Sequence, residues 1–340
     1  MKFQFNRRTA AVTLLIVAVF LLAVNSLLSL FNPQEESQSG QNKLSTFQID
    51  SLFLFSLNSF GLNKEWIKEV QNKKTDKSYI VRLPNDLSIP VVLAEINTNF
   101  FGKNLIFSSE EKDFSGRTRL TINRRNKTIL SAELKYDREI FRPRRKLAFL
   151  IKDYELSSSE DSLFLELPEP FSVLLLPSVQ NTKLLKYVTD LNKTYSIIID
   201  DNIPDIKYRL NESHSQKRLK TSLQSIINDF SKASFFIIND NSDLYLSPSI
   251  EFVKVELEKR NIKMTPLSEI QQLNYANETE LENTFDNYIK EIGEGKGVLF
   301  LITSDEFRTL LPEIERYRKT GIKIVHPSEI ILAADTLAND

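Results

Sequence analysis

Residues 146–178 read KLAFLIKDYELSSSEDSLFLELPEPFSVLLLPS and contain two apolar runs. An unbroken apolar run at residues 147–151 is followed by an amphipathic segment at residues 158–167 and a second apolar run at residues 172–176. Continuous apolar runs indicate strands that are buried on both faces, as in a parallel sheet covered by helices. The stretch therefore predicts a β-α-β unit.

The same alternation continues toward the end of the chain. Further apolar runs lie at residues 196–199, 234–238, 262–264, 298–302 and 322–325. Helical patterns lie between them, at residues 182–191, 216–231, 248–260, 279–292 and 306–320. About seven β-α units in this length favour a closed or nearly closed barrel. An open doubly wound sheet is the alternative. We assign residues 146–332 to this domain and residues 333–340 to a tail.

Residues 44–140 show a different pattern, typical of a small α+β domain. A helix ending at Gly61, a second helix at residues 64–70 and a third at residues 89–100 are predicted. The first helix is expected to bury Phe47, Leu52, Leu54, Phe55 and Leu57. Alternating segments predict strands at residues 79–83, 105–108, 117–123 and 128–136. We expect the helices to cover one face of an antiparallel sheet. The basic run Arg142-Pro143-Arg144-Arg145-Lys146 then indicates a solvated linker between the domains, and the alternative is a patch that contacts anionic glycans or lipid headgroups.

The N-terminal residues predict a membrane anchor. Lys2, Arg7 and Arg8 precede an apolar run at residues 9–31 that contains no charge and no proline. About 20 apolar residues suffice to cross the hydrocarbon core of a bilayer. A cleaved signal peptide is the alternative, but the run is long and lacks a good cleavage site. Residues 1–31 are thus predicted to form a cytoplasmic tip and transmembrane helix, and the polar residues 32–43 a flexible linker.

The positions of the basic residues set the expected orientation. They precede the span, and none follows it until Lys43, so the N-terminus is predicted to be cytoplasmic. The localisation predicted is a bacterial inner membrane, crossed once, with the remaining domains in the periplasm.

Composition excludes several classes of function. The chain carries 44 Lys and Arg against 45 Asp and Glu, so nothing indicates a nucleic-acid partner. It has no cysteine and two histidines, His214 and His326. No motif for a serine hydrolase, a phosphate-binding loop, a dinucleotide fold or a zinc protease occurs.

Three stretches resemble the divergent polysaccharide deacetylases. Residues 146–178 are similar to the first β-α-β unit of that family, and residues 233–264 (ASFFIINDNSDLYLSPSIEFVKVELEKRNIKM) to its fourth strand and following helix. Residues 297–331 (GVLFLITSDEFRTLLPEIERYRKTGIKIVHPSEII) are similar to its last two units. The resemblance implies a distorted (β/α)7-like barrel and metal-assisted removal of an N-acetyl group from a polysaccharide.

The residues that would carry this chemistry differ here. The family's acidic pair becomes Lys152-Asp153, so a lysine occupies the position of the general base and Asp153 that of a metal ligand. Asp200 and Asp201 replace a histidine after the third strand. Residues 239–243 and 303–305 also lack the expected histidines, and neither His214 nor His326 restores them.

In a β/α barrel, functional groups lie where the strands end. The candidate site residues at these ends are Lys152, Asp153, Asp200, Asp201, Asp240, Asp243, Ser304, Asp305 and Glu306. One interpretation is that they cap helices and shape loops, as Asp305 would before a helix at residues 306–320. The other is an acidic site for a cation such as Ca²⁺ or Mg²⁺. Lys152 favours the first, because we expect its ammonium group to contact Asp153, Asp200 or Asp240 in place of a metal.

These features predict a pseudoenzyme without a cofactor, serving as a membrane-anchored binding or scaffold module. Its predicted partners are a cell-envelope polysaccharide such as peptidoglycan, or an envelope protein complex. The alternative is a divergent metal-dependent carbohydrate deacetylase with a rebuilt carboxylate site, which would bind a divalent cation.

Overall fold

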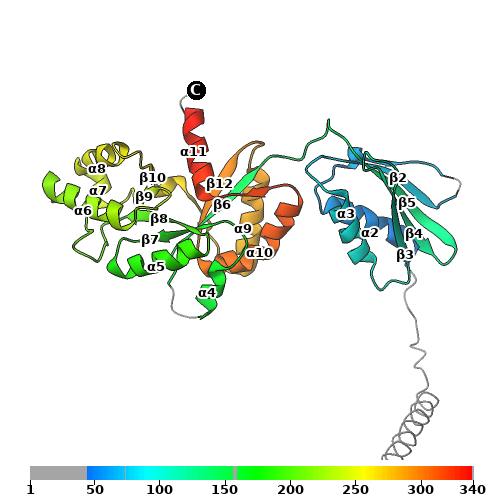
Figure 1. Ribbon diagram of the computed structural model, residues 1–340, viewed down its shortest axis with the longest axis horizontal. Helices are drawn as coiled ribbons and strands as arrows, with labels where there is room; N and C mark the ends of the chain where they lie inside the picture. The colour runs from blue at the N-terminus through cyan, green and yellow to red at the C-terminus, as the bar shows by residue number, and fades with distance from the viewer. Residues whose placement is uncertain (1–43, 73, 156–158, 339–340) are drawn as a thin grey trace, which may run out of the picture.

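The computed structural model describes residues 44–72, 74–155 and 159–338, which form two units (Figure 1). The first unit is built on a five-stranded sheet and the second on an eight-stranded sheet. Among the described residues, no helix is long and apolar enough to cross a membrane. The span predicted at residues 9–31 lies outside them.

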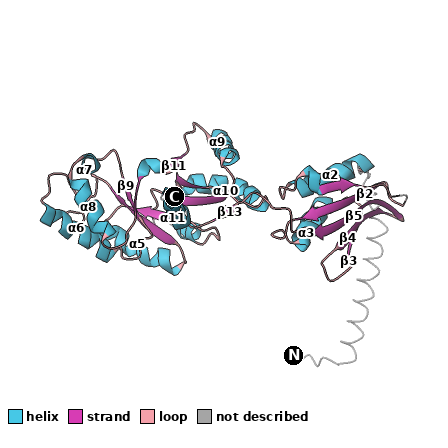
Figure 2. Ribbon diagram, turned by 90° about the horizontal axis from the view of Figure 1, so that it is seen from above, coloured by secondary structure: helices cyan, strands magenta, loops and turns pink. Residues whose placement is uncertain are grey.

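In the first unit, two helices cover one face of the sheet (Figure 2). They are α2 (Thr46–Asn58) and α3 (Ile89–Phe100), and a 3-10 helix, η1 (Lys64–Trp66), follows α2. The strands, in spatial order, are β1 (Ile67–Glu69), β2 (Lys77–Leu83), β5 (Lys127–Tyr136), β4 (Thr118–Arg124) and β3 (Ile106–Glu111). β2 and β5 are parallel, so the antiparallel sheet predicted from the sequence is wrong at this pair. The long connection through α3 makes parallel pairing possible.

Two local predictions in this unit are also wrong. Residues 64–70 form η1 and then β1 instead of one helix, because residues 67–69 pair with β2. Phe47 and Phe55, expected in the core, are 76% and 62% exposed. The side of α2 that packs on the sheet consists of Ile49, Phe53 and Leu57.

The second unit alternates strands and helices. Its strands are β6 (Lys146–Ile151), β7 (Ser172–Leu175), β8 (Thr194–Ile199), β9 (Phe236–Ile238), β10 (Met264–Pro266), β11 (Gln271–Gln272), β12 (Gly297–Ile302) and β13 (Lys323–Ile324). Its helices are α4 (Ser159–Leu165), α5 (Val179–Asp190), α6 (Gln216–Asp229), α7 (Asp243–Leu246), α8 (Ser249–Glu258), α9 (Glu278–Glu291), α10 (Ser304–Lys319) and α11 (Pro327–Ala338), with a 3-10 helix, η2 (Leu267–Glu269), between β10 and β11.

The order of these strands defines a barrel. All neighbours are parallel, in the order β10-β9-β8-β7-β6-β12-β11, with β13 beside β6. Around a ring that starts at β6, the strands follow one another in chain order from β6 to β12. The ring is open between β10 and β11, which do not pair. The sheet is therefore a curled, nearly closed (β/α) barrel, which confirms the predicted fold class.

The two faces of the sheet exclude the doubly wound alternative. Outward residues such as Phe149, Val173 and Ile197 share one core with the helices from α4 to α10. Inward residues such as Leu150 and Leu299 pack with one another and with α11. A doubly wound sheet would have crossover helices on both faces.

Helix α11 packs at the end of the barrel where the strands begin. Ile330 lies so close to Gly297 that a Cβ on this glycine would be 2.1 Å from the Ile330 Cδ1. Glu329 forms an ion pair with Lys146 at 3.3 Å. The helix continues to Ala338, through residues that the sequence pattern assigned to a tail.

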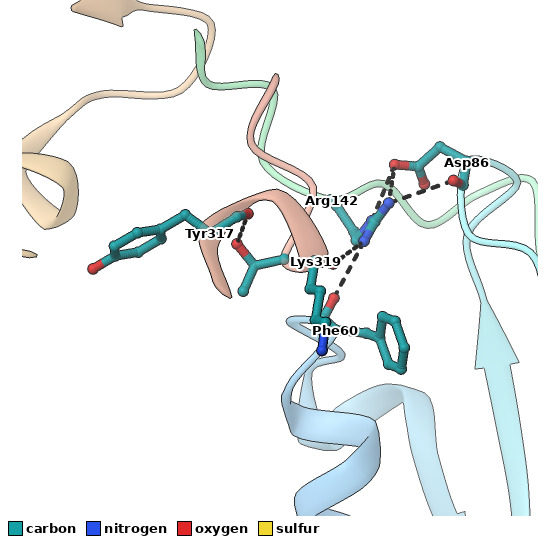
Figure 3. Close-up of polar contacts among 6 residues, drawn as sticks. Phe60, Asp86, Arg142, Tyr317 and Lys319 are labelled. Carbon is teal, nitrogen blue, oxygen red and sulfur yellow. Dashed lines mark hydrogen bonds and ion pairs between the residues drawn. The ribbon is translucent and has the colours of Figure 1, made fainter. Parts of the chain in front are cut away.

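Arg142 joins the two units (Figure 3). Its guanidinium donates hydrogen bonds to the carbonyl oxygens of Lys319 (2.7 Å) and Phe60 (3.4 Å), and to the carboxylate of Asp86 (2.8 Å). The side chain is buried. The basic run at residues 142–146 is therefore not a wholly solvated linker, because its first residue is packed between the units.

Candidate functional site

A cleft of about 730 Å³ opens at the mouth of the barrel, which is the end where the strands finish. Parallel strands bring the residues at their carboxyl ends together at this edge. The floor of the cleft is apolar and the rim is polar. The floor consists of Leu174, Ile198, Leu267 and Leu301, and the rim includes Lys152, Asp153, Glu155, Asp200, Asn202 and Gln272.

Helix α5 extends the cleft on one side. Gln180, Lys183 and Tyr187 line it together with the buried Leu184, while Val188 packs in the core. Ser178 caps the helix by accepting a hydrogen bond from the backbone N–H of Asn181 at 3.0 Å. Tyr187 lines the cleft and is 56% exposed, so a ligand can reach its side chain. The cleft thus combines an aromatic ring, amide groups and two lysines.

Asp200 is the carboxylate that the structure holds most firmly at the mouth. Its Oδ1 accepts from the backbone N–H and the Nδ2 of Asn202, each at 2.9 Å. Its Oδ2 accepts from Nδ2 of Asn239 at 2.7 Å. The two asparagines fix the orientation of this carboxylate.

Three other predicted residues serve the loops around the mouth and do not line the cleft. Asp201 accepts hydrogen bonds from the backbone N–H groups of Asp243 (2.6 Å) and Leu244 (3.3 Å), and so holds the first turn of α7. Asp243 is exposed. Asp240 accepts from the backbone N–H of Ser268 at 3.2 Å. Hydrogen bonding to Ser268 holds the pKa of Asp240 below its usual value. This contact ties β9 to the connection between β10 and β11.

The residues after β12 also act in capping. Thr303 is the N-cap of α10, and Glu306 completes a capping box with it. The predicted cap, Asp305, is wrong: this residue lies in the first turn, is exposed and pairs with Arg308 at 3.4 Å. Ser304 begins the helix. The hydroxyl of Tyr275 donates to Glu306 at 2.6 Å, and this hydrogen bond raises the pKa of Tyr275 to about 12.

Lys152 and Asp153 lie at the mouth as predicted but do not interact as predicted. The backbone N–H of Lys152 donates to the carbonyl of Ile302 at 2.8 Å, which continues the pairing of β6 with β12. Within the described residues, the Lys152 ammonium forms no ion pair, so its expected contact with Asp153, Asp200 or Asp240 is wrong. Asp153 is exposed and has a φ of 55°, a left-handed conformation that Asp tolerates better than most residues. The turn at Asp153 leaves the lysine beside the cleft.

The residues at the mouth do not fit the divalent metal that the deacetylase resemblance implies. A catalytic zinc site needs about three protein ligands. In residues 44–72, 74–155 and 159–338, no group of three or more His, Cys, Asp or Glu side chains could hold a metal ion. Neither histidine lines the cleft, and His326 lies at the opposite end of the barrel, beside Lys193.

Sequence reasoning missed the contribution of α5. Gln180, Lys183 and Tyr187 belong to no motif and follow β7, whose end carries no acidic residue. The spacing of these residues at i, i+3 and i+7 was the available signal, because it places them on one face of a helix that starts at the mouth.

No family model matches the sequence, and no curated protein matches it. Among solved structures, the chain is similar to a CE4 family pseudoenzyme from Bacillus anthracis. A mutant of that protein with restored enzymatic activity shares 12% identity, over 69% of this chain and 96% of its own, with a TM-score of 0.39. The wild type shares 11% identity, over 69% and 93%, with a TM-score of 0.37.

An uncharacterized protein from Agrobacterium tumefaciens shares 14% identity, over 56% of this chain and 89% of its own, with a TM-score of 0.37.

Proposed function

We propose that this chain is a membrane-anchored envelope protein whose barrel mouth binds a cell-envelope glycan without cleaving it. The observation that carries the proposal is the cleft itself, with its apolar floor, amide-rich rim and exposed Tyr187. Ligand sites commonly combine an apolar surface with a few fixed polar groups. A sugar ring presents apolar C–H faces to an aromatic ring, and hydroxyl edges to amides and carboxylates.

The absence of catalysis in this proposal rests on the residues present at the mouth. Lys152 stands where the resembling family has its base, and the carboxylate of Asp200 is held by two asparagines. A protonated lysine donates hydrogen bonds and accepts none, so it suits the recognition of a hydroxyl or an anionic group on the glycan. The proposed ligand is peptidoglycan, which offers both groups.

The proposed anchor is the apolar run at residues 9–31, in a bacterial inner membrane with the N-terminus in the cytoplasm. Its support is the uncharged length of the run and the basic residues before it. A reporter that is active only outside the cytoplasm, fused after Asp340, should be active in cells. An inactive reporter, or a mature N-terminus near Asn32, would contradict the anchor.

Calorimetry with soluble peptidoglycan fragments and the full-length chain in detergent tests the binding. Wild type should bind, and Tyr187→Ala should lose roughly tenfold in affinity, about 1.4 kcal/mol. Phe141→Ala is the matched control, because Phe141 is an aromatic residue of similar exposure, 59%, in the linker between the units. Equal affinities in all three proteins would refute the cleft as the site. Release of acetate on addition of a divalent metal would support the alternative deacetylase instead.

A further inference from the structure

The end of the first unit at which the described chain begins has an unusual surface. Arg124 donates a hydrogen bond to the carbonyl of Leu44, immediately before α2. Ile106, the first residue of β3, pairs with Asn123 of β4. The start of α2, the start of β3 and the turn between β4 and β5 therefore meet at one end, which we call the proximal end.

Large apolar side chains are exposed there. Phe47, in the first turn of α2, is 76% exposed, and Ile106 is 59% exposed. Phe101, which is 84% exposed, begins the short segment that leads into β3. The outward side of α2 continues through Ser51 to Phe55 without a charged residue. Phe107 packs on the core that α2 covers, so its neighbour Ile106 lies on the opposite face of the sheet, at the same end of the unit. Large apolar side chains exposed at one end of a unit commonly mark a contact with a partner or a membrane.

Positive charge accompanies these side chains. Lys103 lies between Phe101 and Ile106, and Arg125 lies in the turn after β4; both are exposed and neither has an ion pair within the described part of the chain. The acidic residues of β3, Glu110 and Glu111, lie at the other end of that strand. Asp76, at the same end as the turn, is paired with Lys127 at 2.7 Å, so Lys103 and Arg125 leave the proximal end positively charged as well as apolar.

We propose that the proximal end docks on the surface of an anionic lipid bilayer, an inference that rests on the membrane anchor proposed above. The apolar run ends at residue 31 and the described chain begins at residue 44, so 12 residues separate them. An extended segment of that length spans at most about 40 Å, which keeps the proximal end close to the membrane. Phe47 and Ile106 enter the boundary between headgroups and acyl chains, and Lys103 and Arg125 contact anionic headgroups.

The absence of cysteine from the chain allows a direct test. Single variants Phe47→Cys, Ile106→Cys and Phe114→Cys of the full-length protein would carry an environment-sensitive fluorophore in mixed phosphatidylcholine–phosphatidylglycerol vesicles. Phe114 is the matched control, because it is fully exposed in the loop at the opposite end of β3 and β4. Lipids brominated on the upper acyl chain should quench the probes at positions 47 and 106, but not at 114. Lys103→Glu combined with Arg125→Glu should reduce this quenching.

Resistance of the protein to alkaline extraction separates the two proposals. A chain that resists extraction but shows no quenching at positions 47 and 106 is anchored without docking, and only the present inference fails. A chain that is extracted lacks the anchor, and both proposals fail. Energy transfer between probes on different chains, in place of lipid quenching, would assign the surface to a second copy and would also overturn the inference.

Discussion

The Arg142 guanidinium donates a hydrogen bond to the backbone carbonyl of Lys319, 177 residues further along the chain, at 2.7 Å. Lys319 is the last residue of α10, where carbonyl groups lack partners within the helix. The same guanidinium reaches the carbonyl of Phe60, just after α2. One side chain thus satisfies the ends of two helices that belong to different units (Figure 3).

Arg142→Ala should destabilise the protein by about 3 kcal/mol, because it leaves two carbonyl groups near the junction without their donor. It should also uncouple the units, so that urea unfolding followed by circular dichroism shows two transitions. Arg144→Ala is the control, since Arg144 is exposed in the same segment. Equal unfolding curves for the two variants would show that the Arg142 contacts contribute little.

Asp286 of α9 pairs with Arg316 of α10 and should make the free energy of unfolding depend on pH. Burial opposes its ionisation, but hydrogen bonds from Lys290, Tyr317 and Arg316 lower the pKa of Asp286 to about 2. A carboxyl group whose pKa is lower in the folded state than in the unfolded state stabilises the fold at pH values above its unfolded-state pKa, near 4. This contribution is lost as the pH falls toward 2. Asp286→Asn should therefore cost about 2 kcal/mol at pH 7, by urea unfolding, and progressively less from pH 4 to pH 2.

The control for that experiment is Asp305→Asn, which removes an exposed ion pair worth less than about 1 kcal/mol. If the free energies of unfolding of Asp286→Asn and wild type differed by the same amount at every pH, folding would not favour the ionised form of this carboxyl group.

The neighbouring residues Asp200 and Asp201 should respond differently to the same substitution. Asp201→Ala removes the acceptor of two backbone N–H groups at the start of α7 and should cost about 1–2 kcal/mol in thermal unfolding. Asp200→Ala releases Asn202 and Asn239, so its main effect should be weaker binding of peptidoglycan fragments in calorimetry. The reverse pattern would place the ligand away from Asp200.

Gly297→Val should displace α11 from the barrel, because the added Cβ would lie 2.1 Å from Ile330 Cδ1 and 3.3 Å from Lys146 Cβ. Hydrogen exchange should then rise over residues 327–332 while β7 and β8 stay protected. Gly293→Ala provides the control, since the nearest atom to its new Cβ belongs to the flexible Lys296 side chain, at 3.4 Å. Unchanged exchange in Gly297→Val would show that Ile330 can move aside without loss of packing.

The barrel could be predicted from the sequence because its strands are buried on both faces. Such strands appear as unbroken apolar runs, and β6, β7, β8 and β12 lie within a residue or two of the predicted ranges. β11 was not predicted, because two polar residues, Gln271 and Gln272, carry no apolar pattern and are strand only through their pairing with β12. β1 was missed for the same reason, since its pairing with β2 is not encoded locally.

The candidate site was predictable in position but not in its contacts. Lys152, Asp153 and Asp200 line the cleft because the ends of parallel strands meet at the mouth. Which carboxylate receives which donor depends on loop conformation. Asp200 is bonded by Asn202 and Asn239, and Asp201 by α7, although the two residues are adjacent in the sequence. Asp200 directly follows β8 and Asp201 lies in the turn after it, so the two side chains reach different partners.

The opening between β10 and β11 has a consequence for solubility. A sheet that does not close has edge strands, and their unpaired backbone groups can recruit strands from other molecules into aggregates. Here the edge strands contain only three and two residues, and Pro266 removes one backbone donor from β10. The barrel therefore avoids intermolecular β-pairing through the shortness of its edges and does not need to complete the ring.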